Sequence, residues 1–302
     1  MGSSETIRRN FSVKNLFMKN ISFCTYLTGL IEGDGTIIVP DQSRSKKNKK
    51  NYPSVQICFH LKDLPLALTV QKTLNCGSLN RKKGVNAYTY TINSKKGLIF
   101  LVSLVNGYMR TPKIYDLWKL IDWLNSEDWY VSLLKDEKIL KGEKDQSSLL
   151  SNSWLSGFIE ADGHFHVRTT PAQFKIECKF ELVQSIVDHN NRSSHSFLEK
   201  IGNTLNCSVK MIRQTKPKKE YRVRTTNIKG NTVLEEYLKE YPLFGSKFLD
   251  FQDWSIVLDF FKKKVHKKQI FYDQIVGIKS GMNQNRKDFG WNHLNHFYHL
   301  EK

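Results

Sequence analysis

The chain has 302 residues, enough for two domains of about 150 residues, each with its own core. It carries 47 basic and 29 acidic residues, and the net charge of +18 favours a polyanionic partner, nucleic acid before an anionic membrane. Five cysteines without a CxxC pair argue against a disulfide scaffold and a zinc finger, and the sequence lacks the apolar run of about 18 residues that a transmembrane helix requires.

Helices and strands are expected to alternate after a basic N-terminal leader, residues 1–22. A helix is predicted from Thr25 to Asp34, with Gly35 as its terminating residue, and a strand over 36–39. Residues 41–51 form a polar, basic loop, and the alternation of apolar and polar residues over 54–61 is typical of a strand with one buried face. The first half then continues with a helix over 64–74, strands over 78–82 and 86–92, and helices over 95–105 and 112–124.

The second half repeats this order after a polar linker, residues 141–152. Its expected elements are a helix over 153–162, strands over 164–169 and 174–183, a helix over 196–205, strands over 207–214 and 220–225, and helices over 230–240 and 246–264. The sequence therefore predicts an α+β fold of two pseudo-symmetric α-β-β-α-β-β-α halves, 23–140 and 153–281, and a C-terminal tail, 282–302. Amphipathic strands predict an antiparallel sheet in each half, packed on helices by one face.

One motif of nine residues occurs twice, as LTGLIEGDG at 27–35 and LSGFIEADG at 155–163. Two further echoes follow in the same order: TLNC at 73–76 and 204–207, and K-x-x-D beginning at Lys113 and at Lys247. Three markers in one order indicate an internal duplication. The duplication predicts a pseudo-two-fold protein in which each half contributes one acidic residue.

Small residues four apart lie on one face of each motif helix: Gly29 with Gly33, and Gly157 with Ala161. This spacing lets two helix backbones approach closely. A glycine inside a helix costs about 1 kcal/mol relative to alanine, and a close helix–helix contact gives that cost a reason. We therefore expect the halves to join at the two motif helices.

Such packing would bring Asp34 and Asp162 together at the negative ends of two helix dipoles. A divalent cation relieves this repulsion, and oxygen ligands without histidine or thiolate favour Mg²⁺. Paired carboxylates on a basic protein indicate metal-assisted phosphodiester hydrolysis. Glu32 and Glu160 lie two residues earlier on another helix face, so we expect them to brace the helix ends.

The two motifs resemble the signature helices of a single-chain LAGLIDADG homing endonuclease, and the resemblance covers nearly all of 23–281. It implies a monomer that makes a metal-dependent double-strand break in a long, asymmetric double-stranded DNA target, which the joined exons around its intron would spell. It also implies an organelle location such as the mitochondrion. Asp34 and Asp162, with the carbonyls of Gly33 and Ala161, would bind the catalytic Mg²⁺; Mn²⁺ would substitute, and Ca²⁺ would bind without supporting cleavage.

Four further residues are predicted to assist at this site. Lys113 and Lys247 resemble the family's core basic residue, which stabilises phosphate charge in the transition state. Aligning SVQICFHL with KIECKFEL places Gln56 opposite Glu177, where family members use polar residues to organise metal-bound water. The alternative for each of these residues is a solvated surface side chain.

Polar side chains on the open strand faces suit the major groove of DNA, and basic turns suit phosphates. The predicted DNA-binding residues are Ser54, Gln56, His60, Arg81, Lys82, His164, His166, Arg168, Lys175, Lys179, Arg222 and Arg224. Two other functions stay open: a maturase that binds intron RNA, and a non-catalytic DNA-binding protein. A metal site at His293, His296 and His299 is less favoured than a mixed polar tail, because neither a carboxylate nor a cysteine accompanies the histidines.

Overall fold

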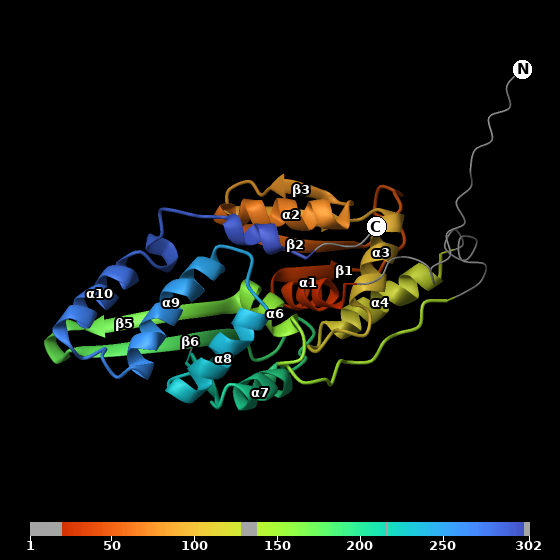
Figure 1. Ribbon diagram of the computed structural model, residues 1–302. Helices are drawn as coiled ribbons and strands as arrows, with labels where there is room; N and C mark the ends of the chain where they lie inside the picture. The colour runs from red at the N-terminus through yellow and green to blue at the C-terminus, as the bar shows by residue number, and fades with distance from the viewer. Residues whose placement is uncertain (1–19, 128–137, 216, 299–302) are drawn as a thin grey trace, which may run out of the picture.

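A computed structural model describes residues 20–127, 138–215 and 217–298 (Figure 1), so residues 1–19 of the predicted leader lie outside the described part. Each half has the predicted order of elements. The first half contains α1 (Ile21–Asp34), β1 (Gly35–Ile38), β2 (Ser54–His60), α2 (Leu64–Leu74), β3 (Ser78–Arg81), β4 (Ala87–Ile92), α3 (Lys95–Val105) and α4 (Ile114–Asn125).

The second half contains α6 (Trp154–Asp162), β5 (Gly163–Thr170), β6 (Lys175–Ser185), α7 (His195–Thr204), β7 (Val209–Ile212), β8 (Glu220–Arg224), α8 (Ile228–Glu240) and α9 (Lys247–Lys262). A further helix, α10 (Gln269–Ser280), was not predicted from the sequence. None of the helices in the described ranges has the length and apolar character needed to cross a membrane.

Each half folds around one four-stranded antiparallel sheet, with strand orders β1-β2-β4-β3 and β5-β6-β8-β7. Val55, Ile57 and Phe59 on β2 are buried, whereas the residues between them are at least partly exposed. Phe180 and Leu182 on β6 are buried in the same alternating way. The predicted sheets with one covered face and one open face are thus confirmed, and each sheet forms part of its own half's core.

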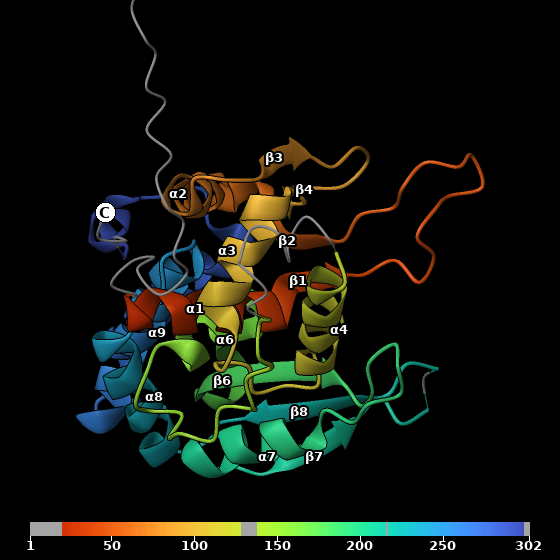
Figure 2. The same cartoon turned by 90° about the vertical axis from the view of Figure 1, so that its right-hand side faces the viewer.

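The two halves join at α1 and α6, which lie side by side at the centre of the molecule (Figures 1 and 2). A Cβ atom on Gly29 would lie 2.0 Å from the carbonyl oxygen of Trp154, and one on Gly157 would lie 1.9 Å from that of Tyr26. A Cβ on Gly33 would lie 2.2 Å from the Cβ of Ala161. These small residues therefore allow the predicted close approach of the two backbones.

Polar side chains cross this helix pair in a nearly symmetric way. Trp154 Nε1 donates to Glu32 Oε2 at 2.6 Å, and Tyr26 Oη donates to Glu160 Oε2 at 3.1 Å. The hydroxyls of Thr25 and Ser153 lie 2.8 Å apart between them. Since Tyr26 and Trp154 occupy the same position in the two motifs, each half supplies one buried donor to the other half's glutamate.

The C-terminal segment 282–298, predicted as a mixed polar tail, is anchored on the rest of the protein by a buried aromatic ring. The segment runs from α10 back to the first half (Figure 1), where the 2%-exposed ring of Phe297 packs edge-on against Phe23, Tyr26 and Phe244. Burial of this aromatic ring outweighs the polarity of its neighbours.

The linker 141–152 contains no helix or strand. Its backbone is held by Arg110, whose guanidinium bonds Asp145 and Ser147. The boundaries proposed for the two halves stay a prediction.

Candidate active site

The acidic residues of both motifs lie at the same end of the central helix pair. Asp34 is the last residue of α1 and Asp162 the last of α6, and the chain continues directly into β1 and β5. Gly35 caps α1 as predicted, in an extended rather than a left-handed conformation. Glycine is required there because a Cβ would lie 2.6 Å from the carbonyl oxygen of Ile31.

Burial destabilises the ionised form of both carboxylates, and the charge of Asp162 adds to this effect at Asp34. Burial, together with the charge of Asp162, raises the pKa of Asp34 to about 6, although Lys247 and Lys113 oppose the shift. Burial likewise raises the pKa of Asp162, against the effect of Lys247 and of a hydrogen bond from Gln184. The two aspartates thus lie together in a partly desolvated position, and their role as metal ligands stays a prediction.

Glu32 and Glu160 brace the helix ends from inside the protein. Glu32 accepts hydrogen bonds from the backbone N–H groups of Arg110 and Thr111, just before α4. Glu160 accepts from Phe244 and Gly245, just before α9. Each glutamate therefore ties its motif helix to the segment that carries the K-x-x-D lysine of the same half, and neither glutamate is available as a metal ligand.

Lys113 and Lys247 cap the carboxyl ends of the motif helices. Lys113 Nζ donates to the carbonyl oxygens of Ile31, Glu32, Gly33 and Gly35, at 3.0, 2.8, 3.3 and 2.6 Å. Lys247 Nζ donates to those of Ile159, Glu160 and Ala161, at 3.1, 2.7 and 2.6 Å. Both ammonium groups thus complement the negative helix ends beside the aspartates.

These lysine contacts bear on the carbonyls predicted to bind metal. The carbonyls of Gly33 and Ala161 each accept a hydrogen bond from the lysine of their own half. A carbonyl oxygen has two lone pairs, so each keeps one for a cation. Within the described ranges, no group of three or more His, Cys, Asp or Glu side chains could hold a metal ion. The available oxygen donors for a cation are therefore two carboxylates together with carbonyls, water and phosphate.

The strand register contradicts the pairing of Gln56 with Glu177. Gly35 lies opposite Ile57, and Gly163 lies opposite Leu182, so the counterpart of Gln56 is Glu181. Glu177 pairs with Arg168, five residues beyond Gly163, or roughly 16 Å along the strand. Its carboxylate is bound by Lys179 at 2.6 Å and Lys175 at 3.3 Å. Glu177 is therefore too far from Asp162 to organise water there.

Gln184 and Glu181 lie near the aspartates and were not predicted from the sequence. Gln184 Nε2 donates to Asp162 Oδ2 at 2.7 Å, although it lies on the row of β6 that the alternation assigns to the core. Gln56 stands opposite Thr36, two residues beyond Asp34, as Glu181 stands opposite His164, two residues beyond Asp162. Only the continued strand register, which the sequence does not determine, would have identified Glu181.

The open faces of the two sheets differ in charge. The open face of β1 to β4 presents neutral side chains that are mostly polar or small, among them Ser54, Gln56 and His60, together with Ile38. The open face of β5 to β8 holds six basic residues, of which Lys210 was not predicted; they are Arg168, Lys175, Lys179, Lys210, Arg222 and Arg224. Glu181 holds Arg224 at 2.5 Å and approaches Arg222 at 4.0 Å.

The remaining predicted contacts are unevenly placed. His164 and His166 lie on the open face, and burial lowers the pKa of both rings. Arg81, the last residue of β3, pairs with Tyr88 on the row that contains the buried Phe59, so it is not an open-face residue, and Lys82 follows it in the β3–β4 connection.

The C-terminal histidines do not form a metal site in the described part of the chain. His293 stacks on Phe248, with ring centroids 4.3 Å apart, and lies 2.9 Å from the carbonyl oxygen of Phe244. His299 lies outside the described residues.

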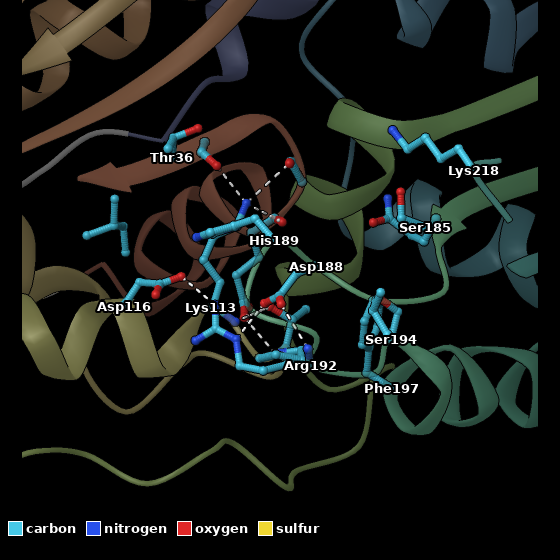
Figure 3. A pocket seen from close by; sticks show the side chains of 18 residues that line it. Thr36, Lys113, Asp116, Ser185, Asp188, His189, Arg192, Ser194, Phe197 and Lys218 are labelled. Atoms are coloured by element: carbon cyan, nitrogen blue, oxygen red, sulfur yellow. Dashed lines mark hydrogen bonds and ion pairs between the residues drawn. The ribbon is translucent and has the colours of Figure 1, made fainter. Parts of the chain in front are cut away.

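A cavity of about 490 Å³ opens beside the end of α1, between the two halves. Figure 3 shows Lys113 reaching toward the carbonyls of α1, and Arg192 between Asp188 and Asp116. Neither Asp34 nor Asp162 lines this cavity, so it adjoins the paired carboxylates without containing them.

Comparison with known proteins decides the family. The model of the LAGLIDADG endonuclease family matches residues 27–124 and again residues 155–258. The chain belongs to the LAGLIDADG endonuclease family. It is a double-motif member, because each half gives its own match and carries its own motif helix and aspartate.

Relatives of this LAGLIDADG protein include the intron-encoded DNA endonuclease aI3 of Saccharomyces cerevisiae, which is 30% identical over 90% of this chain and 72% of its own length. The intron-encoded RNA maturase bI4 of the same yeast is 31% identical over 48% of this chain and 19% of its own length. Among solved structures, the LAGLIDADG homing endonuclease I-GzeII in complex with its DNA target has a TM-score of 0.65 and 20% identity, with coverage of 87% of this chain and 99% of that one.

Proposed function

We propose that this protein is a site-specific DNA endonuclease of the homing type, which makes a metal-dependent double-strand break in a long, asymmetric target. The observation that carries the proposal is the pair Asp34 and Asp162, which end two closely packed helices and both have a pKa raised by burial. The DNA-endonuclease relative, aligned over 90% of the chain, supports it. The proposed location is the mitochondrion, from the resemblance and from the intron-encoded relatives.

The residues present fit a divalent cation. Asp34 and Asp162 supply two carboxylates, and Gly33 and Ala161 supply carbonyl oxygens, a donor set that Mg²⁺ and Mn²⁺ accept. When bound, such an ion lowers the pKa of water and neutralises charge on the phosphate. Because Asp34 is half-protonated near pH 6 without metal, cation binding releases a proton at acidic pH and is weakened there.

The other polar residues prepare this site for the scissile phosphates. Lys113 and Lys247 fix the ends of the motif helices and keep two positive charges beside the aspartates, where negative charge grows in the transition state. Gln56 faces the same region from β2 and can orient the attacking water. Solvent reaches this region, because Asp34 keeps an exposed surface even though the surrounding protein partly desolvates its carboxylate.

The difference between the two sheets supports an asymmetric target. Six basic residues on the second sheet suit guanine edges and phosphates, whereas the first sheet offers neutral hydrogen-bonding groups flanked by basic turns. Two such surfaces read different half-sites, so a palindrome would fully satisfy at most one of the two halves. The twelve DNA-binding residues proposed above stay predictions individually.

The direct test uses a plasmid that carries the joined exon sequence from around this reading frame. Wild-type protein should linearise it in Mg²⁺ or Mn²⁺ and bind it without cutting in Ca²⁺. The control plasmid carries the same sequence interrupted by the intron and should stay supercoiled. Linearisation in excess EDTA, or equal cutting of both plasmids, would contradict the proposal.

The alternative is binding of intron RNA, which the maturase relative supports over about half of the chain. Retention of both aspartates favours cleavage, because RNA binding does not require them. Tight, saturable binding of the intron transcript by a protein that leaves the joined-exon DNA intact would favour the maturase. A protein that bound the DNA site without cutting it or binding the RNA would be the third candidate, a DNA-binding protein alone.

A further inference from the structure

One cross-half contact next to the proposed site breaks the pseudo-symmetry of the molecule. Asp63 lies seven residues after Gln56, and Asp188 lies seven residues after its counterpart Glu181, so the two aspartates are equivalent. Asp63 Oδ1 accepts a hydrogen bond from the backbone N–H of Ser246 at 2.6 Å. This bond ties the first half to the residue just before Lys247 in the second half.

The equivalent bond cannot form on the other side. The residue just before Lys113 is Pro112, which has no N–H to donate to Asp188. The chain instead has a longer connection here, residues 186–194, where the first half has only 61–63. A bridge between Val187 and Ser193 folds it into a small hairpin.

This hairpin places Arg192 where the missing bond would be. Arg192 Nε lies 2.5 Å from Asp188 Oδ2, and Arg192 Nη2 lies 2.7 Å from Asp116 Oδ2 in the first half (Figure 3). The guanidinium also lies over the ring of Tyr115, 5.4 Å from its centroid. One charge-assisted bond, from Arg192 to Asp116, therefore joins the two halves in place of the backbone bond, and the bond to Asp188 holds Arg192 within its own half.

The bridged carboxylate belongs to the helix that carries Lys113. Asp116 is 7% exposed in the first turn of α4, one turn after Lys113, whose ammonium holds the last carbonyls of α1 next to Asp34. A buried carboxylate whose ion-pair partner is removed is strongly destabilised, so the first turn of α4 would shift without Arg192. The shift would pass through Lys113 to the end of α1.

In the second half, the equivalent carboxylate is held by an arginine that does not come from the first half, although the first half also contacts this helix through the bond from Ser246 to Asp63. Asp250, one turn after Lys247 in α9, is bound by Arg286 at 2.8 Å and by the N–H of Asn283 at 2.8 Å. Both partners lie in the C-terminal segment directly after α10, and neither comes from the first half. The two lysine-bearing helices thus depend on different arginines, and of these two arginines Arg192 is the one that comes from across the interface.

We propose that Arg192 is a positioning residue for the first-half catalytic centre, Asp34 with Lys113, and that it makes this centre depend on the second half. The inference rests on the proposed nuclease function, and Arg286 is its counterpart for the centre at Asp162. Loss of either arginine should therefore impair mainly one of the two strand cleavages.

The experiment compares Arg192→Met with Arg286→Met on a target labelled on each strand in turn. Each variant should slow the cleavage of one strand about tenfold more than the other, so that nicked DNA accumulates, and the two variants should spare opposite strands. Arg192→Lys, which keeps one ion pair, should recover part of the lost rate. Equal slowing of both strands, or the same strand bias in both variants, would overturn the proposal.

A second readout requires neither DNA nor catalysis. Hydrogen–deuterium exchange should speed up over 114–121 in α4 for Arg192→Met and over 247–255 in α9 for Arg286→Met, each with the other helix unchanged. If Arg192→Met does not fold, Asp188→Asn weakens the same bridge and should show the α4 effect. Selective exchange in a protein that cuts no DNA would refute the nuclease alone, whereas unchanged or general exchange would refute the positioning role.

Discussion

The close contact between α1 and α6 predicts that an alanine at Gly157 destabilises the protein, whereas an alanine at a helical glycine with open space around it stabilises the protein. A Cβ on Gly157 would lie 1.9 Å from the carbonyl oxygen of Tyr26 and 2.9 Å from the nitrogen of Leu30, both of them backbone atoms. Real Cβ atoms essentially never come within 3.0 Å of such atoms, so the two helices must move apart to admit the methyl group. Overpacking of this kind costs about 1–3 kcal/mol and sometimes more, while alanine recovers about 1 kcal/mol of helix propensity.

We therefore expect Gly157→Ala to lose up to about 2 kcal/mol of stability, which lowers the melting temperature by roughly 3 °C for a chain of this size. The matched control is Gly277→Ala, on α10, where an added Cβ would meet no atom within 4 Å. That variant should gain up to about 1 kcal/mol. Both melting temperatures are measured by circular dichroism in EDTA. A Gly157→Ala protein as stable as the Gly277→Ala protein would refute the close packing of the motif helices.

Three further predictions address the site and the DNA surface. In EDTA, Asp34→Asn should melt at a higher temperature than wild type near pH 8, and this gain should vanish towards pH 4. The reason is that the pKa of Asp34 is raised to about 6, so only the ionised form of its carboxyl is destabilised in the folded protein. An equal gain in melting temperature at both pH values would contradict this prediction. Gly33→Ala should be destabilising alone but tolerated together with Ala161→Gly, since the two Cβ positions lie 2.2 Å apart; additive effects in the double-mutant cycle would argue against this contact. Arg224→Ala should relax base preference at one or two positions of the target, whereas replacing Lys46, Lys47 and Lys49 with serine should weaken binding to all sequences alike. The loop variant should also lower the slope of log affinity against log salt by about 0.9 for each phosphate that the loop no longer neutralises. Binding to single-base variants of the target at several salt concentrations distinguishes the two effects, and the reverse pattern would exchange the roles of strand and loop. Lys50 is left unchanged in that variant, because it already pairs with Glu127 at 2.7 Å.

The features that could be predicted from the sequence are those that produce a local or repeated pattern of residues. The repeated motif predicted the helix pair, the two aspartates and the bracing role of Glu32 and Glu160, and the alternation of residues predicted the one-sided sheets. The register of β6 could not be obtained in this way, because a shift of four residues leaves the alternation intact and exchanges Glu177 for Glu181.

Long-range contacts account for the other differences. Phe297 lies in a polar segment, and nothing local indicates that it enters the first half's core. The lysines were recognised from the K-x-x-D repeat, but their bonds to the helix-end carbonyls depend on where α4 and α9 pack. Arg192 was not singled out at all, because its role follows from a proline in the other half.

Strand cleavage by aspartate variants tests the central claim most directly. Wild type, Asp34→Asn and Asp162→Asn are incubated with the joined-exon plasmid in Mg²⁺, and supercoiled, nicked and linear forms are separated on a gel, with binding measured in parallel in Ca²⁺. We predict linear product from wild type alone and retained binding by both variants, because each carboxylate is needed to hold the cation. Linearisation by either variant at the wild-type rate would contradict a catalytic centre built on Asp34 and Asp162.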